Sequence, residues 1–294
     1  MKYLTEFCLP AERDEAACLV TDIRHDMTCY DANNAYPFMI FSQKGLQRLD
    51  LSSITILYGS NGSGKSTLLN LIAQKLDLSR TTPFNRTPFF DDYLSMCCYE
   101  TAKGKPIPAG SRIMTSDDVF DLMLDVRSLN DGVDRDRKAL FDEWQSLRET
   151  GDCFRMCSLA DYDELKQRRD AYRHTRSNYT ARRLAHALPE HSNGESAYRY
   201  FAQQIKGDAL YLLDEPENSL SAERQMELAA FLEDSARFYG CQFIISTHSP
   251  FLLALRGACI YDLDARPVSV RPWTELSNVR LYYDFFEAHR DEFT

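Results

Sequence analysis

The sequence lacks the long apolar segments that membrane proteins carry. No run of about 18 apolar residues occurs in the 294-residue chain, so no membrane-spanning helix is expected. The opening stretch, "MKYLTEFCLPAERDEAACL", also lacks the apolar core of a signal peptide. We therefore expect a cytoplasmic protein that makes no membrane contact.

Zinc-binding cysteine patterns and an excess of basic residues are also missing. Among the nine cysteines, no C-x₂-C pair meets a second such pair, which argues against zinc and favours reduced thiols. Lys and Arg number 34 against 44 Asp and Glu, which gives a net charge of −10. This balance is unlike that of a nucleic-acid coat protein, although it is compatible with a local basic groove.

The clearest motif present is "GSNGSGKST", residues 59–67. Its spacing, G-x₄-G-K-[ST], is that of a phosphate-binding loop. An apolar, β-branched run over 52–59 predicts a buried strand before it, and helical spacing of leucines and isoleucine over 66–76 predicts a helix after it. A strand before the loop and a helix after it are the context that this motif requires.

The loop residues have physical reasons for their positions. Glycines permit positive φ and close backbone approach, so consecutive N–H groups cradle phosphate oxygens at the start of a helix. Lys65 is expected to reach the β- and γ-phosphates, and Ser66 to place its hydroxyl on Mg²⁺. The predicted nucleotide-binding residues of the loop are Gly59, Asn61, Gly62, Ser63, Gly64, Lys65, Ser66 and Thr67.

A second run, "DALYLLDEPENSLS" over 208–221, places two acids at the end of a short apolar strand. Asp214 is the expected Mg²⁺ ligand, directly or through water. Glu215 is the candidate general base that polarises an attacking water. A strand followed by an acidic turn is the structural alternative, and the phosphate loop upstream makes it the weaker one.

A third apolar strand, "CQFIISTHSP" over 241–250, leads to His248. The segment between it and Asp214 fits a helix whose buried face is Leu228, Phe231, Leu232, Ala236 and Tyr239, with Gly240 as its C-terminal stop. A right-handed strand–helix–strand crossover makes the two strands parallel and close neighbours. Asp214 and His248 are then expected at the same carboxyl edge of the sheet.

A polar turn, "HSNGES" over 191–196, precedes the second acidic motif and by itself indicates only a helix cap. Taken in order, the loop, this turn, "LLDEPE", "ENSLS" and "STHS" resemble the ABC-type ATPases over about residues 50–264. The resemblance implies ATP and Mg²⁺ as cofactors, and a homodimer joined head to tail as an ATP sandwich. It also implies that Ser192, Gly194 and Glu195 contact nucleotide bound to the other chain, and that His248 acts in catalysis beside Glu215.

The polar turn "HSNGES", which stands at the place of the ABC signature motif, and "ENSLS" differ from the forms usual in transport ATPases. They look like those of soluble ATPases related to the RecF, SMC and OLD groups, and of a stand-alone predicted bacterial ATPase. Such a protein is expected to switch a nucleic-acid complex or an effector protein such as a nuclease, in genome maintenance or antiphage defence. The alternatives are the nucleotide-binding subunit of a membrane transporter and a non-hydrolysing nucleotide sensor or scaffold.

Two positions of this family stay open in the sequence. The residue that links Mg²⁺ to the helical subdomain is sought at Ser116, Asp117 or Asp118, where a helix N-cap is an equal reading. The adenine-stacking aromatic is sought among residues upstream of the loop, which are core candidates as well. These aromatics are Tyr30, Tyr36 and Phe38.

The fold expected from these elements is a single α/β ATPase domain over 1–294, a mainly parallel sheet with a helical subdomain inserted at about 119–200. Within that insertion, 166–183 is basic and carries Tyr172 and Tyr179, which suits a nucleic-acid contact, a nucleotide or partner contact, or a solvated helix face. The tail over 275–293 predicts an amphipathic helix that packs on the sheet edge, with a partner-docking surface as the alternative reading.

Overall fold

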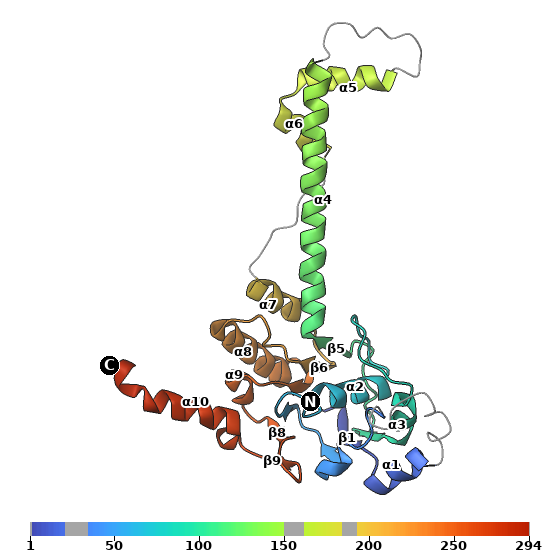
Figure 1. Ribbon diagram of the computed structural model, residues 1–294, viewed down its shortest axis with the longest axis vertical. Coiled ribbons are helices and arrows are strands. Elements are labelled where there is room, and N and C mark those ends of the chain that lie inside the picture. Colours follow the sequence, from blue (N-terminus) through green and yellow to red (C-terminus); the bar gives the residue numbers. More distant parts are fainter. Residues whose placement is uncertain (1, 21–34, 150–161, 184–192, 294) are drawn as a thin grey trace. The chain divides into compact units, whose positions relative to one another are not determined.

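The computed structural model describes residues 2–20, 35–149, 162–183 and 193–293 (Figure 1). The chain forms two compact units, one of Met1–Val119 with Asn193–Thr294 and one of Phe120–Ser192. The helical subdomain predicted over about 119–200 thus extends beyond the second unit. The division predicted from the sequence stays a prediction.

The first unit is built on a six-stranded sheet in the order β5-β6-β7-β3-β8-β9. The five strands from β5 to β8 are parallel, and β9 is antiparallel to β8. This confirms the predicted α/β class with a mainly parallel sheet. In the order of the sheet, the strands are β5 Arg112–Thr115, β6 Leu210–Asp214, β7 Gln242–Ser246, β3 Ile54–Tyr58, β8 Cys259–Asp262 and β9 Ser269–Val270.

The central strands are apolar on both faces because helices cover both sides of a parallel sheet. Every residue of β3 and β7 is buried. In the register of the sheet, Asp214 lies opposite Ser246 on one side and Thr115 on the other, and Ser246 lies opposite Leu57. The predicted adjacency of the strands that lead to Asp214 and His248 is confirmed.

Helices follow the strands in the first unit (Figure 1). The helix predicted between the second and third motifs is α8, capped by the Ser221 hydroxyl and followed by Gly240 at φ +67°. Leu228, Leu232 and Ala236 are buried as expected, whereas Tyr239 lies beyond the helix end and is 64% exposed, which corrects its assignment to the buried face. The helices of this unit are α1 Glu12–Cys18, α2 Lys65–Lys75, α3 Phe90–Met96, α7 Asn193–Gln204, α8 Ala222–Phe238, α9 Pro250–Leu253 and α10 Ser277–Ala288, with short 3₁₀ turns at Ser42–Lys44, Trp273–Glu275 and Arg290–Phe293.

A small antiparallel sheet, β2-β1-β4, packs beside the main one. Its strands are β2 Arg48–Asp50, β1 Leu4–Cys8 and β4 Cys98–Thr101. The buried Gln242 amide ties the sheets together, because it accepts from the backbone N–H groups of Tyr3 (2.7 Å) and Leu4 (3.0 Å) and donates to the Leu4 and Ser52 carbonyls. A polar residue inside strand β7 is therefore fully used by the backbone.

The second unit is helical, as its charged sequence predicts. Helix α4 (Ser116–Glu149) starts in the first unit, and α5 (Tyr162–Arg173) and α6 (Arg176–Ala181) follow in the second. Leu147, Ala171 and Tyr179 form its small core. Buried Tyr179 donates to Glu143 Oε1 (2.8 Å), so this ring is not available for stacking on bases, while Tyr172 is exposed.

The tail helix differs from its predicted packing. Val279 alone of α10 is buried, and most of the large apolar side chains of the helix face solvent. In the described parts of the chain, no helix is both long and apolar enough to cross a membrane.

Candidate functional site

The phosphate loop joins β3 to α2 as the sequence predicts. Gly64 caps the helix in the left-handed region at φ +102°, and a Cβ there would lie 3.0 Å from the Phe41 ring. Another residue would meet both backbone strain and a steric clash at this position. A pocket of about 240 Å³ follows, lined by Asn61, Gly62, Ser63, Gly64, Lys65, Ser66, Thr67 and Glu215.

Two side chains that sequence reasoning missed fix the loop from outside. Lys44 Nζ donates to the carbonyls of Ser63 (2.6 Å) and Leu263 (3.0 Å), and burial lowers the pKa of this lysine. The Asp264 carboxylate accepts from the Ser60 backbone N–H (2.7 Å) and hydroxyl (2.9 Å). Both act across long sequence separations, and no local motif signals them.

Lys65 is buried in the pocket, with 4% of its side chain exposed. Its ammonium donates to the carbonyls of Gly59 (2.8 Å) and Ser60 (3.3 Å), and lies 2.8 Å from His248 Nε2. Burial lowers its pKa, and the nearby carboxylate of Glu215, 3.7 Å away, opposes that shift. The charge is thus held at the loop by polar groups that phosphate oxygens can replace.

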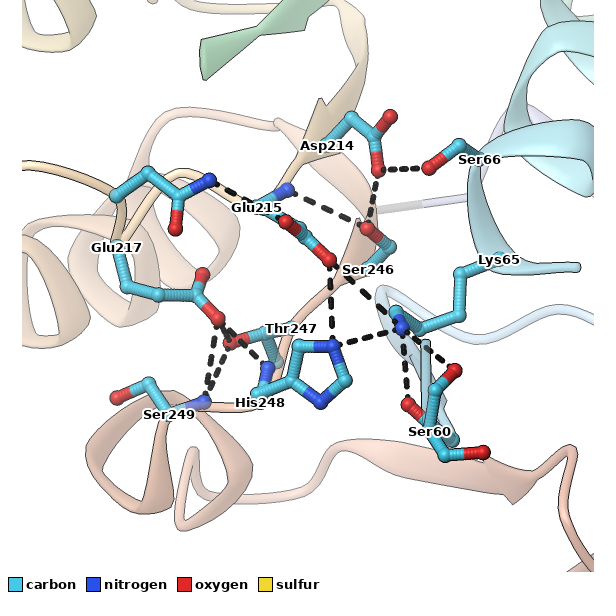
Figure 2. A network of polar contacts seen from close by, with 12 residues as sticks. Ser60, Lys65, Ser66, Asp214, Glu215, Glu217, Ser246, Thr247, His248 and Ser249 are labelled. Carbon is cyan, nitrogen blue, oxygen red and sulfur yellow. Dashed lines mark hydrogen bonds and ion pairs between the residues drawn. The ribbon is translucent and has the colours of Figure 1, made fainter. Parts of the chain in front are cut away.

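Asp214 and Ser66 meet at the carboxyl edge of the sheet (Figure 2). Asp214 Oδ1 accepts from the hydroxyl of Ser66 at 3.1 Å and also from that of Ser246. Desolvation raises the pKa of Asp214, and the hydrogen bonds from Ser246 and Ser66 oppose the rise. A carboxylate and a hydroxyl beside a phosphate pocket fit Mg²⁺, which keeps several waters and takes few protein ligands.

Glu215 follows directly in the left-handed region at φ +47°, a conformation that is strained for a non-glycine residue. Its backbone N–H donates to the Ser246 carbonyl at 3.0 Å, and its Oε2 accepts from Asn218 Nδ2 at 3.2 Å. These contacts point its Oε1 at His248 Nε2 (3.2 Å). The structure therefore brings together three residues that sequence reasoning placed in one site: Lys65, Glu215 and His248.

The His248 Nε2 atom is contacted by two groups at once (Figure 2). Without a proton it accepts from Lys65, and with one it donates to Glu215. The histidine thus lies between the ammonium of Lys65 and the carboxylate of Glu215, which follows β6. Whether Nε2 carries a proton therefore decides whether His248 forms its hydrogen bond with Lys65 or with Glu215.

Glu217 is the functional residue that sequence reasoning passed over. Its Oε1 accepts from Thr247 Oγ1 (2.7 Å) and from the backbone N–H groups of His248 (2.6 Å) and Ser249 (3.2 Å). Its Oε2 is buried and has no hydrogen-bond partner in the described residues. Desolvation raises its pKa. The last acid of "DEPE" thus fixes the backbone that carries His248.

We expect Glu217→Ala to lower both stability and turnover, because it leaves the His248 N–H and the Thr247 hydroxyl unsatisfied, at about 1–3 kcal/mol each. Glu217→Gln should cost much less, since its amide oxygen accepts the same bonds and the raised pKa already favours an uncharged group. Chemical denaturation and steady-state phosphate release measure both effects. Equal losses in the two variants would contradict this role.

The signature residues are only partly described. Ser192 lies outside the described residues. Gly194 and Glu195 are in the first turn of α7, where Glu195 Oε1 accepts from Arg199 at 2.8 Å. Their predicted contact with nucleotide on another chain stays a prediction.

A second pocket, of about 800 Å³, lies beside Ser66 and Asp214 and separates the candidates for the adenine-stacking aromatic. Tyr36 lines it and donates to Thr67 Oγ1 at 3.0 Å, whereas Phe38 is buried edge-on against Tyr93. Tyr30 lies outside the described residues.

The same pocket separates the three candidates after β5 for the residue that links Mg²⁺ to the helical subdomain. Ser116 and Asp117 line this pocket. Asp118 is buried and accepts from the backbone N–H groups of Thr115 (2.7 Å) and Thr82 (3.1 Å), which is the capping alternative.

Residues 109–254 match a family described as "AAA domain, putative AbiEii toxin, Type IV TA system". A search of curated proteins finds no match to the chain.

Solved structures that match the chain include the SMC head domain from Thermotoga maritima, at 14% identity, TM-score 0.40 and coverage of 92% of this chain and 98% of that one. A second is the Smc head domain from Pyrococcus furiosus bound to the C-terminal domain of ScpA (14%, 0.37, 83% and 95%). A third is a dimeric ATP-binding cassette in a post-hydrolysis state with ADP and Pi (14%, 0.34, 78% and 90%).

Proposed function

We propose that this chain is a P-loop ATPase of the ABC type, which binds Mg·ATP, pairs head to tail with a second copy and hydrolyses the γ-phosphate. The observation that carries the proposal is the convergence of Lys65, Glu215 and His248 within 3.7 Å of one another at the end of the parallel sheet. That edge is where ligands bind in such folds.

Each residue has a separable task. The backbone N–H groups at the start of α2 and the Lys65 ammonium bind phosphate oxygens, in place of the carbonyls of Gly59 and Ser60. Glu215 accepts a proton from the attacking water. As that proton moves, His248 forms a hydrogen bond with either the Lys65 ammonium or the Glu215 side chain. Glu217 holds the His248 backbone in place.

Ser66 and Asp214 are the residues that would hold Mg²⁺, which neutralises charge on the β- and γ-phosphates when bound. A protonated Asp214 is a poor ligand, and desolvation raises its pKa. Affinity for Mg·ATP is therefore expected to fall as the pH falls into the range where Asp214 takes up its proton.

In this proposal, ATP hydrolysis switches the conformation of a complex with nucleic acid or with an effector protein such as a nuclease. The setting would be genome maintenance or antiphage defence. For nucleic acid, the supporting observation is the exposed basic set of Lys166, Arg169 and Arg173 on α5. Part of the basic stretch is used internally, because Arg183 pairs with Glu143 (3.5 Å) and Asp170 (3.8 Å).

Phosphate release by the purified protein, with Mg²⁺ and with EDTA, tests the proposal. Slow, Mg²⁺-dependent release is expected, and ATP binding without any release would leave a nucleotide sensor in its place. Repeating the assay with double-stranded DNA, single-stranded DNA and RNA tests the switch. Stimulation that is lost when Lys166, Arg169 and Arg173 become Glu supports nucleic acid, and indifference to all three supports a protein partner.

A further inference from the structure

The C-terminal helix α10 presents an apolar face to solvent. This face consists of Leu281, Tyr282, Tyr283, Phe285, Phe286 and Phe293, whose exposed fractions run from 45% to 73%. Ring contacts join Phe286 to Phe285 (5.5 Å) and to Phe293 (6.1 Å), so the patch is continuous. Large aromatic side chains exposed together are unusual on a monomer and mark an interface.

The start of α10 is anchored at the nucleotide site. Tyr58, the last residue of β3, contacts the hydroxyl of Ser277 (3.0 Å) through its own hydroxyl, which also accepts from the Asn278 backbone N–H (3.0 Å). The Asn278 amide donates to the His248 carbonyl (3.4 Å). The helix therefore begins against the strand before the phosphate loop and against the histidine of the site.

The charged residues of α10 indicate whether its apolar face suits a membrane, nucleic acid or protein. Arg280, Asp284 and Glu287 recur at i, i+4 and i+7, so they share one stripe that borders the aromatic face, where the Arg280 guanidinium lies over the Tyr283 ring at 5.1 Å. Asp291 and Glu292 follow, which makes the segment acidic overall. An interfacial membrane helix carries Lys and Arg on its polar face, and nucleic acid requires a basic surface. The apolar face therefore fits protein.

Its size fits a second copy of this chain. An aromatic side chain offers about 150–250 Å², so six large side chains at about half exposure present on the order of 600 Å². Phe251 and Trp273 add the wall of an adjoining groove of about 840 Å³, which Tyr282 and Phe286 also line. Together this approaches the roughly 800 Å² per partner of a stable interface.

We propose that α10 joins two copies of the chain through this apolar face, without nucleotide. A two-fold interface requires a surface that complements itself, and an apolar stripe with its acidic residues outside it meets that condition. In an antiparallel pair, Tyr282 of one copy lies beside Phe285 of the other. The link raises the effective concentration of two nucleotide heads for each other, a consequence that rests on the proposed function.

The test is the mass of the nucleotide-free protein in EDTA, measured by light scattering and sedimentation across the micromolar range. Wild type is expected to be dimeric. Phe285→Glu with Phe286→Glu should weaken dimerisation at least about 100-fold, as for central interface residues. The matched control is Asp284→Ala with Glu287→Ala on the polar stripe, which should stay dimeric. A monomeric wild type, or an unchanged aromatic variant, would overturn the proposal.

A second set of variants distinguishes loss of the interface from loss of folding in the glutamate variant. Tyr282→Cys with Phe285→Cys should form a crosslinked dimer on oxidation, and Glu287→Cys should show no more crosslinking than the native cysteines give, among them the exposed Cys98. Equal crosslinking in both would contradict the proposed pairing. ATP binding by the same preparations is a separate readout: a nucleotide-free dimer that binds no ATP would refute the proposed function and leave this inference standing.

Discussion

Glu215→Gln is expected to keep ATP binding and to lower turnover by about 10²–10⁴-fold, the usual contribution of a general base. The amide preserves the size of the side chain and an oxygen for the Asn218 contact, but it cannot accept the proton of the attacking water. Two ATP molecules should then stay trapped between two chains. Retention of labelled ATP through gel filtration, together with single-turnover phosphate release, measures both effects.

The experiment is sharpest in chains that also carry Phe285→Glu, because the trapped sandwich then appears as a shift in mass that depends on ATP. Glu223→Gln, on the exposed first turn of α8, is the matched control and should turn over like wild type. Loss of ATP binding by Glu215→Gln would contradict its role as base. Turnover equal to wild type would support a route to hydrolysis that does not use this carboxylate.

Lys65→Ala is expected to weaken ATP binding by about 10²–10³-fold, because each charge-assisted hydrogen bond to phosphate contributes about 1.5–3 kcal/mol. The side chain is almost fully buried, and its ammonium is already positioned by the carbonyls of Gly59 and Ser60. Isothermal titration with ATP and Mg²⁺ measures the loss.

Lys75→Ala is the matched control for that variant. Lys75 lies in the last turn of the same helix, α2, and its ammonium donates to the Leu94 carbonyl (2.9 Å) rather than to the loop. Its replacement should leave ATP affinity unchanged. Equal losses in the two variants would show that α2 is destabilised as a whole, and would remove the case for a direct phosphate contact by Lys65.

Local chemistry explains why the main elements could be predicted. The glycines of the loop, the acids that end β6 and the histidine after β7 lie next to runs of apolar residues that form buried strands. Parallel strands with right-handed crossovers then bring these ends to one edge of the sheet. The class of fold and the adjacency of the strands that lead to Asp214 and His248 followed from that rule.

Exposure of single side chains did not follow from periodicity. Tyr179 and Tyr172 were equal candidates for stacking, and packing in the second unit buried the first and left the second exposed. The tail helix was expected to pack on the sheet edge, but the contacts with Tyr58 and His248 are made by its first residues, and most of its large apolar side chains are exposed. A helical pattern shows which residues share a face but does not show whether anything covers it.

The sequence by itself determined the phosphate loop, the order of the motifs and the parallel sheet, because each depends on residue types at short spacing. Only the tertiary structure decided that Lys44 and Asp264 secure the loop, that Glu217 holds the His248 backbone, and that α10 starts at the site. These contacts join residues that lie 19 to 219 positions apart, and no local motif signals them. They arise when strands β3, β7 and β8 are brought side by side, and no local pattern encodes that meeting.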